Sequence, residues 1–203
     1  VTVKGTNDAP LIDVNSDTTG AVTESGLAGA GTPSVSGVMA ASDADADAEQ
    51  TWTISSDNST TVYGDLTIEP DTGKWTYTLD NTLAATQALN NGESATQNYT
   101  IRVTDDFGAY ADQDIEITIT GTNDAAVVSS ANEVLIEADV LLSASGTLIS
   151  TDVDNVDNTF AANTIVGTYG DFAIDVNGAW TFTAKAAFDE LNVGDSYAET
   201  FNV

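Results

Sequence analysis

The sequence predicts an all-β protein with two immunoglobulin-like β-sandwich domains in tandem and about seven strands in each domain. Three observations support this prediction: a repeated sequence pattern, a period-two alternation of β-branched and aromatic residues, and turn motifs at short intervals. Alternation over four to eight residues is typical of half-buried strands. About seven such strands per hundred residues indicate a sandwich.

The repeat is clearest in the tetrapeptide Gly-Thr-Asn-Asp, which stands at residues 5–8 and again, 116 residues later, at residues 121–124. Each copy follows an alternating run, Val1–Lys4 in the first case and Ile115–Thr120 in the second. Four further blocks recur in the same order: Ser-Gly followed by Asp-x-Asp, then Tyr-Gly-Asp, Gly-x-Trp-Thr-aromatic-Thr and Leu-Asn-x-Gly. Self-similarity of this kind predicts a tandem array of one structural unit.

The repeat also predicts the domain boundaries. The segments are the last strand of a preceding repeat (residues 1–4), the first sandwich (5–120) and the second sandwich (121–203). Val203 aligns with Ile101, so we expect the second repeat to lack a counterpart of the final hairpin, Arg102–Thr120. Either the fragment is truncated there or its open edge is filled from elsewhere. One hypothesis is that Val1–Lys4 of a neighbouring molecule completes it by strand addition.

The elements of the first repeat follow from runs that alternate with a period of two. The expected strands are Leu11–Val14, Ala21–Thr23, Ser34–Ala40, Trp52–Ser55, Gly64–Glu69, Lys74–Leu79, Gln97–Thr104 and Ala109–Thr120. Turn chemistry at Pro70–Gly73 and at the Asn-Gly pairs 91–92 and 177–178 separates the hairpins. Helical periodicity is limited to a turn or two around Leu83–Leu89 and Ala184–Leu191.

The repeated aromatic residues are expected to form the core of each sandwich. Trp75 and Trp180 stand at equivalent positions, and Tyr77 and Phe182 follow two residues later. Residues two apart in a strand point to the same face, so each pair is expected to pack between the sheets.

Composition narrows the function. The apolar fraction of 41% is enough for packed cores, while 32 acidic residues against 4 basic ones give a net charge of −28. Such a surface repels nucleic acid and anionic membranes, and it also predicts a neutralising cation. The absence of Cys and His excludes the usual zinc, copper and haem sites. No apolar run is long enough to insert into a membrane.

The strand order of a sandwich predicts that acidic residues collect at the two ends of each domain. Alternate loops of a seven-stranded Greek key lie at the same end. Expected at one end are the entering linker with Asn7 and Asp8, the loop Ser42–Gln50 and the hairpin Thr104–Gly108. We expect Glu24 and Asp80 at the other end. There they would face the exit linker Asn123–Asp124 and, in the next repeat, Asp152 and Asp154.

Carboxylate and amide oxygens in this number are the ligands that Ca²⁺ prefers. In an extended segment, Asp43, Asp45 and Asp47 would lie on one face, about 6.6 Å apart for alternate residues. An EF-hand is excluded because its sixth and twelfth positions would be Ala48 and Ile54. The candidate calcium ligands are Asn7, Asp8, Glu24, Asp43, Asp45, Asp47, Asp80, Asp105, Asp106, Asn123, Asp124, Glu137, Asp152, Asp154 and Asp157.

Three alternatives stand beside the calcium hypothesis. The acidic loops could be no more than solvated surface. The chain could be a carbohydrate- or cell-surface-binding module, for which Trp52 is the one tryptophan without a tryptophan at the matching position of the other repeat. A hydrolase with paired carboxylates is disfavoured, because repetition explains the acids and an active site has no reason to occur in both copies. We expect no enzymatic activity.

The linker Gly5–Pro10, the Tyr-Gly-Asp and Gly-x-Trp segments, and Val103–Gly108 resemble VCBS-type repeats. These are cadherin-like modules of very large bacterial surface proteins, including RTX adhesins exported by type I secretion. Asn7–Pro10 is similar to the calcium-binding linker of cadherins, and Asp43-x-Asp45 to their paired-aspartate loop. The second linker, Asn123–Ala126, departs from this pattern because it lacks the proline.

The resemblance implies secreted extender domains that calcium makes rigid and that project a ligand-binding region from the cell surface, in adhesion or biofilm formation. The implied partners are neighbouring repeats of the same chain, while a glycan or host-cell ligand would bind other regions of the parent protein.

Overall fold

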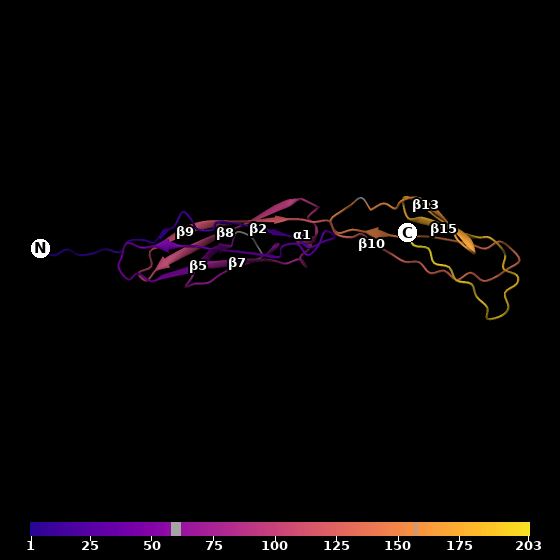
Figure 1. Cartoon of the computed structure of the whole chain (residues 1–203), viewed down its shortest axis with the longest axis horizontal. Helices are drawn as coiled ribbons and strands as arrows, with labels where there is room; N and C mark the ends of the chain where they lie inside the picture. Colours follow the sequence, from indigo (N-terminus) through magenta and orange to yellow (C-terminus); the bar gives the residue numbers. More distant parts are fainter. Residues whose placement is uncertain (58–61, 157) are drawn as a thin grey trace. The chain divides into compact units, whose positions relative to one another are not determined.

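The computed structural model describes residues 1–57, 62–156 and 158–203, which form two compact units, Val1–Ala125 and Ala126–Val203. Figure 1 shows that both units consist of strands, and the described part contains a single short helix, α1 (Ala84–Gln87). The prediction of an all-β sandwich protein is confirmed.

The first unit packs a four-stranded sheet against a three-stranded sheet. The larger sheet has the order β2 (Thr19–Thr23), β9 (Tyr110–Thr120), β8 (Ser94–Asp105) and β5 (Gln50–Asp57). The smaller sheet has the order β3 (Ser34–Val38), β7 (Lys74–Leu79) and β6 (Gly64–Ile68), and the short strands β1 (Leu11–Ile12) and β4 (Ala41–Ser42) pair with each other. Strand β2 runs parallel to β9, whereas the other pairs are antiparallel.

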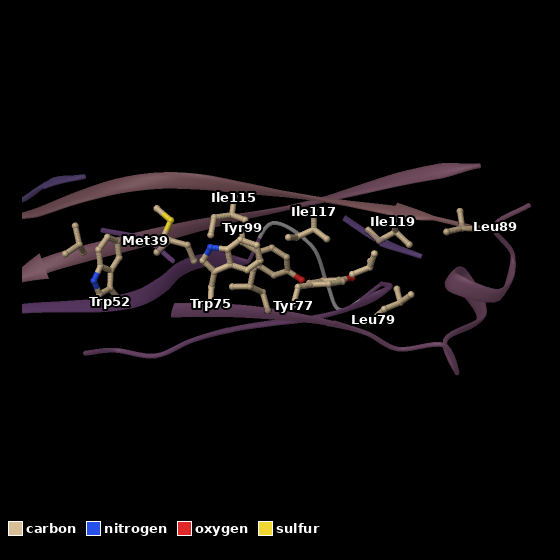
Figure 2. Packing of buried hydrophobic residues seen from close by; sticks show 14 residues of the cluster. Met39, Trp52, Trp75, Tyr77, Leu79, Leu89, Tyr99, Ile115, Ile117 and Ile119 are labelled. Atoms are coloured by element: carbon tan, nitrogen blue, oxygen red, sulfur yellow. The ribbon is translucent and has the colours of Figure 1, made fainter. Parts of the chain in front are cut away.

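The core of the first unit lies between these sheets (Figure 2). Strand β9 buries alternate residues, so Ile115, Ile117 and Ile119 point inward as the period of two predicts. Trp75 and Tyr77 of β7 face them from the other sheet and are fully buried. Their polar atoms are satisfied there, because Trp75 Nε1 donates to the Asp17 carbonyl and the Tyr77 hydroxyl donates to Gln97 Oε1.

The second unit has one four-stranded sheet, with the order β11 (Ser143–Thr147), β15 (Ala179–Ala184), β14 (Gly170–Ile174) and β13 (Asn163–Val166). The short strands β10 (Val127–Val128) and β12 (Ser150–Thr151) pair as β1 and β4 do. Its buried core is smaller and consists of Leu148, Phe172, Ile174 and Trp180, with Phe182 and Phe201 packed against it.

The sequence repeat corresponds to a repeat of backbone geometry. Gly73 and Gly178 both have a left-handed φ, of 67° and 77°, at the turn that leads into the tryptophan strand. A Cβ at these positions would lie 2.4 Å from the Met39 carbonyl oxygen and 2.3 Å from that of Leu148. Only glycine fits such a close approach of two backbones, which explains why the Gly-x-Trp block occurs in both copies.

Trp52 does not form an exposed platform for a sugar. It belongs to the core with 4% of its surface exposed, and it packs beside Gly73. Phe160 lies beside Gly178 in the same way, so a phenylalanine takes the place of Trp52 in the second unit. This finding removes the residue on which the carbohydrate-binding alternative rested.

Two local expectations differ from the structure. The segment Asp43–Asp47 was expected to be extended, but it forms bends and a turn after β4, and Asp47 adopts a left-handed φ of 62°. The three carboxylates therefore do not follow one strand face. In addition, α1 lies within the first helical segment expected, whereas Ala184–Leu191 forms turns after the end of β15.

Candidate metal centre

The entering linker is held by side chains from two distant loops of the first unit. Asn7 Nδ2 donates to Asp105 Oδ2 at 2.9 Å, and the backbone N–H of Asp8 donates to Asp45 Oδ2 at 2.7 Å. Asn7 Nδ2 also contacts the Asp8 carbonyl at 2.9 Å. The linker, the loop after β4 and the β8–β9 hairpin thus meet at one end of this unit, as the strand order predicts.

Asp105 is a buried carboxylate with several hydrogen bonds at this end. It ends β8 with only 6% of its surface exposed, and its Oδ1 accepts from the backbone N–H groups of Phe107 and Ala109, both at 2.9 Å. The Asn7 amide lowers the pKa of Asp105, and the hairpin N–H groups lower it further against the opposing effect of desolvation. Asp105 is therefore held as an anion. Its neighbour Asp106 is exposed.

Asp43 and Asp45 form an Asx turn in which the Asp45 N–H donates to Asp43 Oδ1 at 2.9 Å. The other oxygen, Asp43 Oδ2, is buried and has no hydrogen-bond partner within the described ranges. A buried carboxylate oxygen without a donor is costly, and a hard cation is a suitable partner for it. The donor set at this end therefore fits Ca²⁺. Asp47 is exposed and has a left-handed φ of 62°.

The opposite end of the first unit is organised around Glu24. Glu24 directly follows β2. Because β2 runs parallel to β9, Glu24 lies near the last residue of β9, Thr120, whereas Asp105 lies near its first residue, Tyr110. Glu24 is fully buried, and it accepts from Gln87 Nε2 at 2.9 Å and from the Thr122 N–H at 3.2 Å. The Asn123 carbonyl accepts from the Leu27 N–H at 2.8 Å. The carboxylate of Glu24 and the exit linker are thus held together.

Asp80 does not share the environment of Glu24. Its Oδ1 accepts from the backbone N–H of Thr82 at 2.8 Å and from the Thr82 hydroxyl at 2.6 Å, and this local turn lowers its pKa. The residue that reaches the Glu24 region is Asn81, whose Oδ1 accepts from the Ser25 N–H at 3.0 Å.

The exit linker repeats the local geometry of the entering linker. Asn123 Nδ2 donates to the Asp124 carbonyl, as Asn7 does to the Asp8 carbonyl. Asn123 is exposed and Asp124 is partly buried. The tetrapeptide thus makes the same internal hydrogen bond in both places.

In the second unit, Asp152 and Asp154 repeat the turn of Asp43 and Asp45, with the Asp154 N–H directed at Asp152 Oδ1 at 3.4 Å. The Asp154 side chain, which is 7% exposed, raises the pKa of Asp152, since two adjacent carboxylates retain a proton between them. This is the electrostatic signature of a pair that favours a proton or a cation. Asp157 lies outside the described residues.

Glu137 belongs to an acidic group that the sequence did not reveal. Carboxylate oxygens of Glu137, Asp139 and Asp189 lie within 4.8 Å of one another, and all three side chains are exposed. Asp189 stands 52 positions from Glu137, and no local pattern joins the two. Sequence reasoning also missed Asn81, Gln87 and Thr122 around Glu24, because it considered mainly charged residues and these three are neutral.

A β-sandwich unit with acidic residues at both ends, followed by a second β-unit of related sequence, defines a class of tandem β-module. A family model for the bacterial cadherin-like domain matches residues 7–121, which is more than half of the chain. The chain belongs to this family of bacterial cadherin-like domains. Domains of this family are structural and adhesion modules and not enzymes.

Solved structures with a similar fold are cadherin ectodomains. PcdhgB3 EC1-4 is 14% identical with a TM-score of 0.45, and the alignment covers 89% of this chain and 42% of that one. Human CDH23 EC21-23 is 15% identical with a TM-score of 0.47 and coverages of 90% and 55%. Drosophila N-cadherin EC1-4 is 14% identical with a TM-score of 0.37 and coverages of 90% and 43%. The chain thus spans about half the length of these proteins.

A search of curated proteins gives no match to this chain. Within the described part, no helix is long and apolar enough to cross a membrane.

Proposed function

We propose that this chain is a calcium-rigidified spacer of a large bacterial cell-surface adhesin. One observation carries the proposal: the entering linker is bound to the carboxylates of Asp45 and Asp105, beside the buried Asp43 oxygen that lacks a donor. Side chains from three separate segments are thus prearranged at one end of the first unit. This preorganisation is what an oxygen-coordinated ion needs.

Calcium would supply positive charge and six to eight coordination positions at each end of a unit. At the entering end of the first unit, the carboxylates of Asp43, Asp45 and Asp105 and the linker oxygens of Asn7 and Asp8 would hold it. At the exit end of the first unit, Glu24 and the linker residues Asn123 and Asp124 would contribute ligands. In the second unit, Asp152 and Asp154 would bind a further ion as Asp43 and Asp45 do in the first.

The free energy available from such sites is moderate for one ion and large for several. Extracellular calcium sites have dissociation constants of about 10⁻⁴–10⁻³ M. At tenfold excess of calcium, one site adds roughly 1.4 kcal/mol to the folded state. The net charge of −28 increases the need for these ions, because repulsion between carboxylates opposes a compact chain.

This calcium dependence agrees with secretion to the cell surface. A chain that needs millimolar calcium stays poorly folded where calcium is low, which suits export as an unfolded polypeptide by the type I route of RTX adhesins. Outside the cell, bound calcium would straighten successive repeats and project a distant ligand-binding region. Support for adhesion and biofilm formation would then be a mechanical role of these repeats.

Isothermal titration of calcium into the whole chain tests the proposal. We expect fewer ions per chain for Asp43→Ala and for Asp152→Ala than for the wild type. Asp114→Ala is the matched control, because it removes the same charge from an exposed position in the middle of β9, between the two ends of the first unit. Equal stoichiometry in all four proteins, or no heat of binding in the wild type, would refute the proposal.

A further inference from the structure

The turn between α1 and β8 holds the start of the exit linker, whose first residue is Gly121. The Gly92 N–H donates to the Gly121 carbonyl at 3.0 Å, and the Gly121 N–H donates to the Glu93 carbonyl at 2.8 Å. A Cβ on Gly121 would lie 2.5 Å from the Leu89 carbonyl oxygen, so the backbones of the linker and the turn are in close contact. The conformation of this turn therefore positions the start of the linker.

The side chains of Asn90 and Glu93 stabilise this turn. Glu93 Oε2 accepts from the backbone N–H and from the side-chain amide of Asn90, both at 3.1 Å. In the second unit, Asp195 Oδ2 accepts from the backbone N–H and the side-chain amide of Asn192 in the same way, at 3.0 Å and 3.1 Å. Both copies of the turn thus depend on their first and fourth residues.

The second residue of the turn differs between the two copies. The first unit has Asn91 where the second unit has Val193. The glycine that follows has a left-handed φ in both units, of 78° at Gly92 and 98° at Gly194. The Asn91 side chain is exposed, and within the described ranges it adds no hydrogen bond to the turn. The geometry of the turn therefore does not require an asparagine at this position.

An asparagine that precedes a glycine can react with its own backbone. The backbone nitrogen of the glycine attacks the asparagine Cγ and forms a C–N bond that closes a cyclic imide. The bond from Cγ to the side-chain nitrogen breaks, and ammonia leaves with the proton of the attacking nitrogen. Water then opens the ring at one of its two carbonyl groups, which gives aspartate or isoaspartate. Glycine favours the first step because it has no side chain that hinders the approach.

The two Asn-Gly pairs of the chain differ in the room that they leave for ring closure. A Cβ on Gly92 would have no atom within 4 Å of it. A Cβ on Gly178 would lie 2.3 Å from the Leu148 carbonyl oxygen and 2.7 Å from the Phe160 ring. Because ring closure turns the peptide group between the two residues, the packed pair of the second unit has to open locally before it reacts. The structure thus favours reaction at the pair of the first unit.

We propose that Asn91 is a site of spontaneous deamidation in the folded protein and that this modification releases the start of the exit linker from the turn. Both products add a carboxylate to a chain whose net charge is already −28. Isoaspartate also adds one carbon to the main chain before Gly92, which displaces the Gly92 N–H from the Gly121 carbonyl. The reaction consumes only water, so it depends on time and pH and needs no partner enzyme.

Tryptic peptide mapping of the whole folded chain after incubation at pH 8 tests the site. Trypsin isolates Asn91 in the peptide Trp75–Arg102 and Asn177 in the peptide Val103–Lys185. We expect the Asn91 peptide to gain the mass of an NH₂-to-OH replacement at least about tenfold faster than the Asn177 peptide, and fragmentation to place the gain at Asn91. In urea, the two peptides should react at similar rates because both contain an Asn-Gly pair. An Asn91 peptide that keeps its mass in the folded protein, or equal rates of the two peptides there, would overturn the proposal.

Amide hydrogen exchange tests the effect on the linker. The Gly121 N–H is bound to the Glu93 carbonyl, and we expect it to exchange at least about tenfold faster once Asn91 is converted. Asn91→Val is the matched control, because the second copy of the turn carries a valine at this position. After the same incubation, the variant should show no mass gain in this peptide and an unchanged exchange rate at Gly121. An unchanged Gly121 rate in the converted wild type would show that the linker stays bound, and the proposal would be wrong.

Discussion

The side-chain amide of Asn7 donates to the carboxylate of Asp105 across 98 residues of sequence, at 2.9 Å. This bond fixes the entering linker on the β8–β9 hairpin without the help of an ion. Because the hairpin N–H groups already hold the other oxygen of Asp105, the carboxylate has one defined orientation. The linker is therefore part of the folded unit and not a free tether.

Replacing Asp105 by alanine should reduce both calcium affinity and stability. The substitution removes the acceptor for Asn7 and for two backbone N–H groups, so we expect a melting temperature several degrees lower and a weaker calcium titration. Asp106→Ala is the control, since Asp106 is exposed and lies next to it in sequence. If the two variants behave alike, Asp105 has no special role at this end.

The low pKa of Asp105 predicts how stability depends on acidity. Its folded-state pKa lies below the unfolded value of about 3.9, so its contribution is present above that value and is lost as the pH falls through the folded pKa. Urea unfolding in EDTA from pH 3 to pH 7 measures the free energy of unfolding. Its decrease toward low pH should be smaller for Asp105→Asn than for the wild type. Parallel curves would contradict this assignment.

Asp152 should behave in the opposite sense. The raised pKa of Asp152 means that the folded state binds the proton more tightly than the unfolded state does. Without calcium, the contribution of Asp152 to the free energy of unfolding is therefore present at low pH. It is lost as the pH rises from the unfolded-state pKa through the folded-state pKa. At pH 7, Asp152→Asn should raise the melting temperature in EDTA and lower it in millimolar calcium. A change of the same sign in both buffers would show that Asp152 is not paired with a cation.

The repeated Ser-Gly block should be intolerant of a side chain. A Cβ on Gly37 would lie 2.5 Å from the ring of Trp75, so we expect Gly37→Ala to lower the free energy of unfolding by about 1–3 kcal/mol. Gly5→Ala is the control, because a Cβ added to Gly5 would have no atom within 4 Å of it. Chemical denaturation of both variants measures the difference, and an equal cost would refute the packing argument.

The sequence was sufficient for the sandwich because the alternating pattern and the core tryptophans are local signals that both copies carry. It also predicted that Asn7, Asp8, Asp45 and Asp105 share one end, since strand order alone determines which loops meet. It was wrong about the extended conformation of Asp43–Asp47, where Asp47 adopts a left-handed φ, and it did not predict that the Asp80 carboxylate accepts hydrogen bonds from Thr82.

The contacts that the sequence did not predict involve neutral or distant groups. Gln87 reaches Glu24 only because α1 positions it, and Asp189 joins Glu137 through turns with no recognisable pattern. The sequence matches Asn158–Phe160 to the Trp52 segment, but it does not show that the Phe160 ring takes the place of Trp52 beside the turn glycine. Such contacts depend on tertiary structure and not on local pattern.

Thermal melting of the wild-type chain in EDTA and in millimolar calcium tests the central claim most directly, with magnesium as the control ion. One calcium site at tenfold excess adds roughly 1.4 kcal/mol, which corresponds to a shift of at least about 6 °C for a domain of this size. We expect a rise of that size or more with calcium and a much smaller rise with magnesium. Superimposable melting curves in EDTA and calcium would contradict it.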